Sequence, residues 1–406
     1  MKKVYIVGIG VGNKCFMHQK SIVSIEKSEC LIGTKRMLDT FSYLNKETFE
    51  SISAKEIYDY INNDNHNIFS VLVSGDVGFY SISKKLTEML MENEQIEIEN
   101  IAAVSSVQYF CSKLNLSWDG MKLVSAHGRN INIISNVMFN KKVFLLTGGE
   151  FKPNDICEIL TSKGLGNLLV SVGENLSYEN ERIIEDSASN IAKMNFESLA
   201  VMIIQNHEAL DLSVGLNSIK DSEFITGSSP MTKSEVRTIS VSKLNLKNDS
   251  VVYDIGAGTG SVSIETALRL SNGSVYAIEK NEDAILLIKK NIEKFKAYNI
   301  EIIKNVAPDG LEILPKPDSV FIGGSSGNLN KIIEAILKKN PFVNLVINTI
   351  TLENLNESLL CMEKYKFNDV EIINVAISKA KKAGSYNMMM GQNPIYIISG
   401  RGSGSN

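Results

Sequence analysis

The stretch VVYDIGAGTG, residues 251–260, decides the fold of the second half of the chain. It reads as an apolar strand carrying one acid, Asp254, followed by a Gly-x-Gly-x-Gly loop, and a helical pattern begins directly afterwards at residues 261–270. Glycines let the backbone turn sharply and approach a ligand closely, and the first turn of the next helix offers free N–H groups. A glycine-rich loop alone is weak evidence for a binding site, so the neighbouring strands must support it.

The following strands end in residues that suit an adenosine ligand. The strand at 274–279 ends in Glu279, about 20 residues past the loop, where a carboxylate can accept both ribose hydroxyls. The next two strands lead to Ala307, whose small side chain can flank an adenine ring, and to the glycine-containing turn at 323–325. Ligands of open α/β sheets bind outside the carboxyl ends of the strands, so we expect these segments to share one cleft.

The pattern Asp-x-Gly-x-Gly-x-Gly differs from the Gly-x-Gly-x-x-Gly pattern of dinucleotide-binding loops. It is typical of methyltransferases that use S-adenosylmethionine, with Asp254 near the amino-acid end of the cofactor. We therefore favour a methyltransferase over two alternatives, a nicotinamide-dependent enzyme and a turn that binds no ligand.

The segment before this motif contains a helix start. Thr232, with Glu235 three residues later, predicts a capping box. Two interpretations stay open. The segment is only a helix cap, or it covers the cofactor and turns Lys233 or Arg237 toward an anionic substrate.

Alternating strand and helix patterns occur in both halves and predict α/β domains with largely parallel sheets. In the first half the expected strands are 3–9, 68–74, 96–101, 142–147, 168–172 and 199–205. In the second half the alternation runs from 235 to 366, and two final strands, 369–376 and 394–399, are expected to pair as an antiparallel hairpin at the sheet edge. The expected division is a domain at 1–205, a linker at 206–222, a domain at 223–400 and a disordered tail at 401–406.

Composition excludes several classes of protein. The 406-residue chain has 42 Lys and Arg against 46 Asp and Glu, a net charge of −4, so it has no global basic field for nucleic acid. It contains no apolar run long enough to span a membrane, and its start lacks a signal-peptide pattern. Its five cysteines include no Cys-x-x-Cys pair, which disfavours a disulfide framework and a zinc site. We expect a cytoplasmic protein with no metal and with no nucleic-acid or membrane partner.

The first half carries a second glycine-rich loop, GIGVG at residues 8–12, but no acid precedes it. Arginine is scarce, with 6 in the whole chain, so each one is a candidate for planar recognition of a carboxylate. Glu174 and Arg182 are expected to be an ion pair or surface charges rather than catalysts. The candidate site residues of this half lie in the turns that follow its strands, and they are Gly75, Asp76, Ser105, Ser106, His127 and Arg129.

Together these motifs resemble known families over nearly the whole chain. Residues 1–205 resemble the tetrapyrrole (corrin/porphyrin) methylases, through the segments 7–10, 32–36, 74–76, 105–106 and 127–129. Residues 221–400 resemble the decarboxylating precorrin methyltransferases, through the segments 221–224, 232–237, 254–260, 307–308, 321–325 and 393–394. The two regions, in this order on one chain, resemble the bifunctional precorrin-6Y methyltransferases (decarboxylating) of cobalamin biosynthesis. Val11 and Val77 depart from this resemblance, because the first family usually has proline there.

The resemblance implies an α/β fold in two parts: an N-terminal two-lobed tetrapyrrole methylase fold, then a Rossmann-like class I S-adenosylmethionine methyltransferase domain. The first would methylate carbon 5 of a precorrin or cobalt-precorrin. The second would methylate carbon 15 and release the ring C acetate carboxylate as carbon dioxide, with one S-adenosylmethionine site in each half. We also expect a homo-oligomer. The residues that match the families' cofactor contacts are Gly75, Asp76, Ser105 and Ser106, and then Thr232, Asp254, Gly256, Ala257, Gly258, Thr259, Gly260, Glu279 and Ala307.

Methyl transfer to carbon needs no strong protein base, because the sulfonium donor carries its own leaving group. The protein mainly aligns the reactants and excludes water, so we assign no catalytic residue. A precorrin carries several carboxylates, and we hypothesise that Arg36, His127 and Arg129 anchor it in the first half, and Lys233 and Arg237 in the second. In the alternative, only the C-terminal domain is active, on another substrate such as RNA, and the first domain is a tetrapyrrole-binding module.

Overall fold

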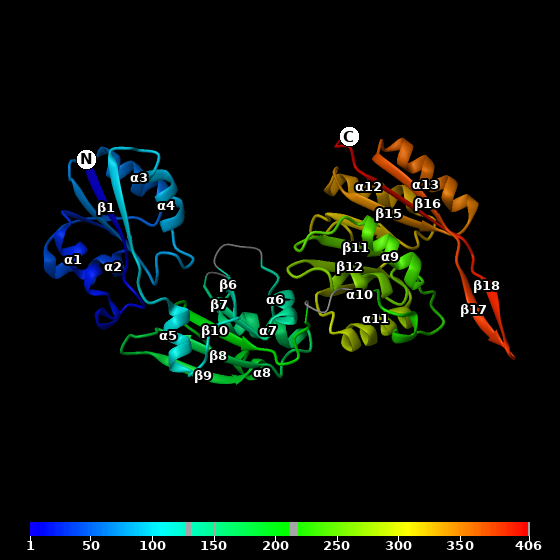
Figure 1. The fold of residues 1–406 in the computed structure, drawn as a ribbon, viewed down its shortest axis with the longest axis horizontal. Helices are drawn as coiled ribbons and strands as arrows, with labels where there is room; N and C mark the ends of the chain where they lie inside the picture. The colour runs from blue at the N-terminus through cyan, green and yellow to red at the C-terminus, as the bar shows by residue number, and fades with distance from the viewer. Residues whose placement is uncertain (127–130, 149–150, 212–217, 405–406) are drawn as a thin grey trace. The chain divides into compact units, whose positions relative to one another are not determined.

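The computed structural model describes residues 1–126, 131–148, 151–211 and 218–404. Contacts divide the chain into two compact units (Figure 1). The first comprises Met1–Arg129 and Lys142–Gln205, and the second comprises Asn130–Lys141 and Asn206–Asn406. No helix within the described ranges combines the length and the apolar character needed to cross a membrane.

A five-stranded parallel sheet forms the first lobe of the first unit. The strands are β1 (Lys2–Gly8), β2 (Cys30–Gly33), β3 (Glu47–Glu50), β4 (Ile68–Val73) and β5 (Ile96–Ile101), and the helices are α1 (Gln19–Lys27), α2 (Lys35–Asp39), α3 (Ala54–Asn63) and α4 (Ser83–Leu90). The strand order is β3-β2-β4-β1-β5. Phe69 and Val71 pack into one hydrophobic cluster and Leu72 into another. Both faces of β4 are therefore buried, as parallel sheets require.

The second lobe of the first unit has a mixed sheet. Its elements are α5 (Ser106–Lys113), β6 (Lys122–Ser125), β7 (Lys142–Leu146), α7 (Pro153–Ser162), β8 (Leu169–Glu174), β9 (Arg182–Ser187), α8 (Ala188–Ile191) and β10 (Ala200–Gln205). The strand order is β6-β7-β10-β8-β9, and only the β6–β7 contact is parallel. The prediction of a largely parallel sheet is wrong here, because a short connection joins β8 to β9 and β10 inserts between β7 and β8.

The helix α6 (Ile133–Phe139) lies in the first half of the sequence but groups with the second unit. The Asn132 side chain donates hydrogen bonds to the Gly273 carbonyl and to Ser274 Oγ, both at 2.7 Å. The Asn206 amide donates to the Val137 carbonyl at 2.9 Å. The division by contacts thus places residues 130–141 in the second unit, whereas the expected division kept residues 1–205 together.

A seven-stranded sheet forms the second unit. Its strands are β11 (Val251–Ile255), β12 (Ser274–Glu279), β13 (Ile300–Lys304), β14 (Ser319–Ile322), β15 (Asn344–Thr349), β16 (Asn368–Val375) and β19 (Ile395–Arg401), and its helices are α9 (Ser234–Lys243), α10 (Ser261–Ala267), α11 (Glu282–Phe295), α12 (Leu329–Lys339) and α13 (Leu352–Lys364). The order is β13-β12-β11-β14-β15-β19-β16. The chain moves outward from β11 to β13 and then returns to β14 on the other side of β11. This reversal is the switch point at which open α/β sheets bind ligands.

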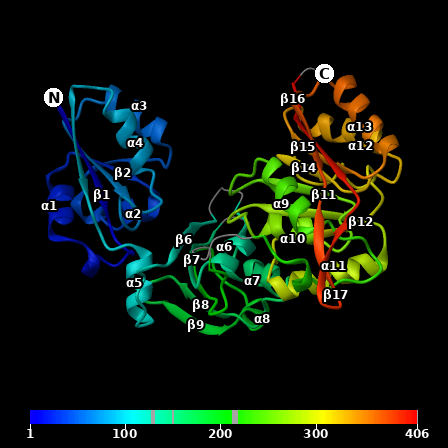
Figure 2. The same cartoon turned by 45° about the vertical axis from the view of Figure 1, so that its right-hand side comes forward.

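The end of this sheet confirms one prediction and adds a feature that the sequence patterns missed. β16 pairs antiparallel with β19 at the sheet edge, as expected. Between them, β17 (Ser378–Ala383) and β18 (Tyr386–Gly391) form a separate two-stranded ribbon. Figure 1 shows this ribbon extending away from the seven-stranded sheet, and in Figure 2, where that side is turned forward, the ribbon is drawn over α11. We call it the β17–β18 ribbon.

The C-terminal residues continue the sheet instead of forming the expected disordered tail. Arg401 ends β19 and pairs with Asn344. The Gly402 amide donates to the Val343 carbonyl at 2.9 Å, and the Gly404 amide donates to the Pro341 carbonyl at 3.0 Å. Backbone hydrogen bonds thus order the chain as far as Gly404, and residues 405–406 lie outside the described ranges.

Candidate active sites

Two glycines of the 256–260 loop bring three loops of the second unit into close contact. Gly256 has φ +73°, and a Cβ atom there would lie 2.7 Å from the Gly324 carbonyl oxygen. Gly258 has φ +56°, and its Cβ would lie 2.8 Å from the Pro230 carbonyl oxygen. Only glycine tolerates both the backbone conformation and the approach. The loop can therefore pack against the segments at 230 and 324. The Gly256 and Ala257 amides donate to the Ile278 carbonyl at 3.0 and 3.2 Å, which holds the loop on the end of β12.

A cleft of about 330 Å³ lies at the carboxyl ends of the central strands. The predicted cofactor residues that line it are Thr232, Asp254, Gly256, Ala257, Gly258, Glu279 and Ala307. Thr259 and Gly260 do not line it. Thr259 is fully buried, and Gly260 caps α10 and packs against Ile288. These two residues shape the turn instead of facing a ligand.

Sequence reasoning missed several lining residues. Lys280, Asn348 and Ile350 also face the cleft. Each follows or ends a strand at the same sheet edge, so the strand-end rule could have identified them. Asn348 was hard to single out, because its partner, Ser240 on α9, is 108 residues away in sequence.

Asp254 is buried in the floor of the cleft. Its Oδ2 accepts a hydrogen bond from the Ser263 hydroxyl, whereas Oδ1 is buried and has no partner among the described residues. Burial raises the pKa of Asp254 to about 7, and the nearby charge of Glu279 adds to the rise, while the Ser263 hydrogen bond opposes it. The carboxyl group thus has one unused acceptor and a strong preference for a cationic or hydrogen-bond-donating partner.

Glu279 ends β12 and is held in place by backbone amides. Its Oε2 accepts from Gly258 N at 2.8 Å, and its Oε1 accepts from Lys280 N and Asn281 N, both at 2.9 Å. The carboxylate is therefore locked beside the glycine-rich loop, with acceptor capacity left for a ligand hydroxyl.

The predicted capping box at α9 is wrong. The residue before the first helical turn is Lys233, and no side chain caps it. Glu235 instead pairs with Lys379 at 2.8 Å, which lowers the pKa of the Glu235 carboxyl. Thr232 lines the cleft, and Lys233 is exposed. Of the two interpretations left open, the geometry favours a segment that covers the cleft.

Arg237 cannot anchor a substrate, contrary to our hypothesis, because it is completely buried. Its Nε donates to Glu265 Oε1 at 2.6 Å, and Nη1 pairs with Asp221 Oδ1 at 3.2 Å. The guanidinium also donates to the Thr232 and Ile219 carbonyls, both at 2.5 Å, and lies over the Phe224 ring. Four of its five N–H donors are thus used inside the protein, where they hold the segment that leads into α9.

The first unit has a cleft of about 400 Å³, lined by residues of both lobes. Of the residues singled out in the sequence, Gly75, Ser106 and Arg36 line it. The Gly75 amide donates to the Gly10 carbonyl at 2.8 Å, and the Gly10 amide donates back to Gly75 at 3.2 Å. This pair of hydrogen bonds joins the two glycine turns at the carboxyl ends of β1 and β4.

Two predicted residues of this cleft have structural roles. Asp76 accepts hydrogen bonds from Gly78 N at 2.8 Å and from Ala103 N at 3.0 Å. Ser105 is buried and forms a capping box with Gln108 at the start of α5. Neither lines the cleft, so both shape the loops that do. His127 and Arg129 lie outside the described residues.

Glu174 and Arg182 form the expected ion pair. Glu174 is buried and also accepts from the Glu197 amide, while Arg182 donates to the Asn195 carbonyl at 2.9 Å. The pair secures the turn just before Ser198 and Leu199, which line the first-unit cleft.

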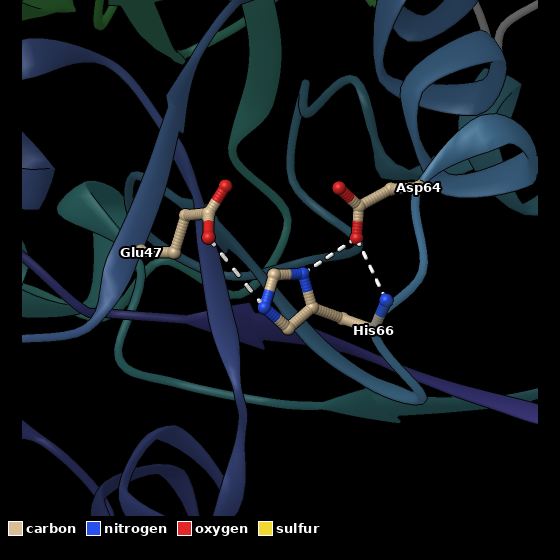
Figure 3. A group of neighbouring side chains, drawn as sticks. All are labelled: Glu47, Asp64 and His66. Carbon is tan, nitrogen blue, oxygen red and sulfur yellow. Dashed lines mark hydrogen bonds and ion pairs between the residues drawn. The ribbon is translucent and has the colours of Figure 1, made fainter.

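Within the described ranges, one group of side chains has the composition of a metal site: Glu47, Asp64 and His66 (Figure 3). His66 Nδ1 lies 2.5 Å from Asp64 Oδ1, and Nε2 lies 3.6 Å from Glu47 Oε2. Each ring nitrogen thus faces its own carboxylate, which is the geometry of an imidazole held between two acids.

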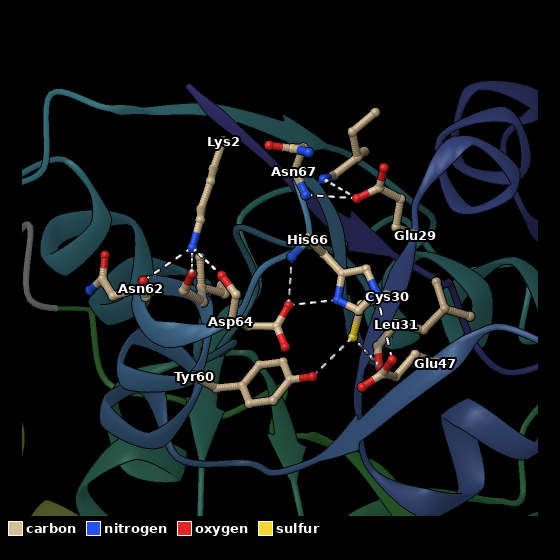
Figure 4. A network of polar contacts seen from close by, with 12 residues as sticks. Lys2, Glu29, Cys30, Leu31, Glu47, Tyr60, Asn62, Asp64, His66 and Asn67 are labelled. Atoms are coloured by element: carbon tan, nitrogen blue, oxygen red, sulfur yellow. Dashed lines mark hydrogen bonds and ion pairs between the residues drawn. The ribbon is translucent and has the colours of Figure 1, made fainter.

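The surroundings of His66 support a structural role (Figure 4). Lys2 Nζ donates to the Ile61, Asn62 and Asp64 carbonyls and so caps the end of α3. Glu47 begins β3, and His66 precedes β4. The network therefore lies at the amino ends of the parallel strands, opposite to the cleft.

Two family matches cover most of the chain. Residues 3–192 match the Tetrapyrrole (Corrin/Porphyrin) Methylases, and residues 223–400 match the Precorrin methyltransferase domain. A Saccharolobus solfataricus protein named probable cobalt-precorrin-6B C(15)-methyltransferase (decarboxylating) is 45% identical over 177 residues, 42% of this chain and 88% of that protein. A Methanocaldococcus jannaschii protein of the same name is 44% identical over 181 residues, 44% of this chain and 96% of that protein. A crystal structure named precorrin-6y C5,15-methyltransferase, from Geobacter metallireducens, is 39% identical and covers 46% of this chain and 97% of its own, with a TM-score of 0.43.

The sheet order, the glycine-rich loop and the acid at the tip of β12 define the second unit as a class I S-adenosylmethionine-dependent methyltransferase fold. The chain belongs to the decarboxylating precorrin methyltransferase family and carries a tetrapyrrole methylase domain ahead of that region. The resemblance and the fold class predicted from the sequence are both confirmed.

Proposed function

We propose that this protein is a bifunctional methyltransferase of cobalamin biosynthesis that acts on a precorrin or cobalt-precorrin. The second unit methylates carbon 15 and releases the ring C acetate carboxylate as carbon dioxide, and the first unit methylates carbon 5. The observation that carries the proposal is the second-unit cleft, which is lined by Gly256, Gly258 and Asp254 and in which the buried Oδ1 of Asp254 has no partner among the described residues. The relatives named as decarboxylating C(15)-methyltransferases supply the substrate class.

S-adenosylmethionine supplies a methyl group on a sulfonium, with a neutral thioether as the leaving group. The residues present suit this molecule. Glu279 offers acceptors for ribose hydroxyls, Asp254 offers a free acceptor for the amino-acid end, and Gly258 lines the cleft without a side chain. We propose one such site in each unit, because each has its own cleft, of about 330 Å³ and about 400 Å³.

The rim of the second-unit cleft suits a flat macrocycle that carries carboxylates. Ile350 is 59% exposed beside the cleft and offers an apolar surface. Lys280 lines the cleft, Lys233 follows the cleft-lining Thr232, and both are exposed and offer cations. These residues replace Arg237 as the proposed substrate anchors of this unit, and they orient the ring at the cleft.

We further propose that the protein is a homo-oligomer. The support is the β17–β18 ribbon, because an isolated two-stranded ribbon is marginally stable in water. Tyr386, Met388 and Met390 alternate along one strand and are 76%, 53% and 49% exposed. A second copy of the chain would cover this apolar surface.

We also propose that the protein is cytoplasmic and that it has no nucleic-acid partner. The support is the net charge of −4 and four buried free cysteines, which suit a reducing compartment.

A product assay by mass spectrometry tests the function. The purified chain is incubated with S-adenosylmethionine and with metal-free or cobalt-loaded precorrin-6B. Gain of two methyl groups with loss of one carbon dioxide supports the bifunctional proposal and reports the metal state used. Gain of one methyl group with loss of carbon dioxide would limit the activity to the second unit. No mass change with either substrate would favour the alternative, a methyltransferase that acts on another substrate such as RNA.

A further inference from the structure

Arg36 is the only charged side chain among the described residues that line the first-unit cleft. It lies on α2, just after the carboxyl end of β2, and it is exposed. No carboxylate of the described chain lies within ion-pair distance of it. An arginine without an acidic partner in a cleft is poised to receive an anion.

The partner that Arg36 does have is neutral. Its Nη1 donates to the Tyr178 hydroxyl at 2.7 Å, and its guanidinium carbon lies 5.9 Å from the centre of the Tyr178 ring. The phenol occupies one of the five N–H donors. The edge formed by Nε and Nη2 stays available for a bidentate pair with a carboxylate.

The glycine-rich loop of β1 fixes the position of Tyr178. Gly12 has φ +119°, and a Cβ atom there would lie 2.4 Å from Tyr178 Cζ. The neighbouring Ser177 donates from Oγ to the Val11 carbonyl at 3.0 Å and accepts from Asn13 N at 3.1 Å. The connection between β8 and β9 is thus fastened to residues 11–13, and the absence of a side chain at Gly12 makes room for the tyrosine ring.

We propose that Tyr178 is a positioning residue for substrate recognition: it holds the Arg36 guanidinium at the mouth of the first-unit cleft, ready to bind a carboxylate of the tetrapyrrole. A flexible arginine loses rotamer freedom when it binds, and a fixed partner removes part of that cost beforehand. Tyr178 therefore acts through Arg36 and does not touch the reacting carbon. The inference rests on the proposed function of the first unit.

The test uses the full chain and precorrin-6B, with binding measured by titration and with carbon 5 and carbon 15 methylation scored separately. Tyr178→Phe keeps the ring and removes the hydroxyl. We expect a roughly tenfold rise in the dissociation constant of the Arg36-dependent site and in the KM of carbon 5 methylation, since the Arg36 side chain must then lose its rotamer freedom on binding. The kcat of carbon 5 methylation and both constants of carbon 15 methylation should not change. Tyr43→Phe, which removes an exposed hydroxyl outside the cleft lining, is the matched control.

A double-mutant cycle separates positioning from a general structural effect. In an Arg36→Gln background, Tyr178→Phe should have no further effect on binding or on KM. Additive losses, or wild-type constants in Tyr178→Phe alone, would overturn the inference. If the wild-type chain binds the tetrapyrrole but does not methylate carbon 5, the proposed function of the first unit fails, while the binding cycle still decides the role of Tyr178.

Discussion

Arg237 donates from Nε to Glu265 Oε1 at 2.6 Å, and both side chains are withdrawn from solvent. The same guanidinium binds the carbonyls of Ile219 and Thr232. Thr232 lines the second-unit cleft. The arginine therefore ties the segment that covers the cleft to α10, the helix that follows the glycine-rich loop.

Arg237→Met should destabilise the second unit by about 3–5 kcal/mol, because it leaves the Glu265 carboxylate buried without its cation. The single tryptophan, Trp118, belongs to the first unit. Denaturation followed by tryptophan fluorescence should therefore match wild type, whereas the second-unit transition in far-UV circular dichroism should shift to lower denaturant. Lys338→Met, which breaks an exposed pair with Glu334, should cost less than about 1 kcal/mol. Equal effects of the two variants would contradict this assignment.

Asp254→Asn should become more stable relative to wild type as pH rises. The folded-state pKa of Asp254 is raised to about 7 by burial, so folding favours the protonated form. That stabilising contribution is complete below the ordinary carboxyl pKa and is lost as pH rises toward 7. The difference in unfolding free energy should therefore grow by roughly 1.4 kcal/mol per pH unit between pH 5 and 7 and then level off. Urea denaturation at several pH values measures it, and a constant difference would refute the raised pKa.

Gly258→Ala should weaken S-adenosylmethionine binding at least about tenfold. The added methyl group would lie 2.8 Å from the Pro230 carbonyl oxygen, at a backbone φ of +56°, so the loop or the segment at 230 must move. Isothermal titration calorimetry measures the affinity. Gly391→Ala is the control, because its Cβ would meet only Ser378 Oγ, at 3.9 Å. Unchanged affinity in Gly258→Ala would mean that the loop is not part of the cofactor site.

Glu279→Gln should also lower the affinity for S-adenosylmethionine, by about tenfold, because it replaces a charged acceptor with a neutral amide. The melting temperature should fall as well, because an amide oxygen that accepts from the Gly258 N–H leaves the NH2 group facing the Lys280 and Asn281 N–H donors that Glu279 Oε1 now binds. Glu301→Gln, at an exposed position on the neighbouring strand β13, controls for the loss of one charge. A Glu279 variant that binds as tightly as wild type would exclude ribose recognition by this residue.

Met388→Lys should reduce the molar mass in solution, measured by light scattering after size-exclusion chromatography, toward that of a single chain. The substitution puts a charge on the exposed apolar face of the β17–β18 ribbon, and burying it in an interface is costly. Met91→Lys, at a 72% exposed site in the first unit, should leave the mass unchanged. A wild-type chain that is already monomeric would contradict the proposed oligomer.

Much of the second unit could be predicted from the sequence, because its strands are short apolar runs that end in recognisable turns. The strand at 274–279 and its terminal Glu279 were predicted at the positions that the structure shows. The glycines of the 256–260 loop were also predictable, since a positive φ and a close backbone approach leave no alternative residue. Local periodicity and turn chemistry determine these features.

The features of the fold and of the clefts that could not be predicted depended on contacts between residues far apart in sequence. Arg237 reads as a free cation until the tertiary structure surrounds it with Asp221 and Glu265. The antiparallel insertion of β10 between β7 and β8 follows from pairing across the chain, which no local pattern encodes. Tyr178 had no motif at all, and only the fold brings it to Arg36 from 142 residues away. The sequence alone thus determined which turns can hold a ligand, whereas the tertiary structure decided which charges face the clefts, because burial and ion pairing depend on neighbours that the chain supplies only when folded.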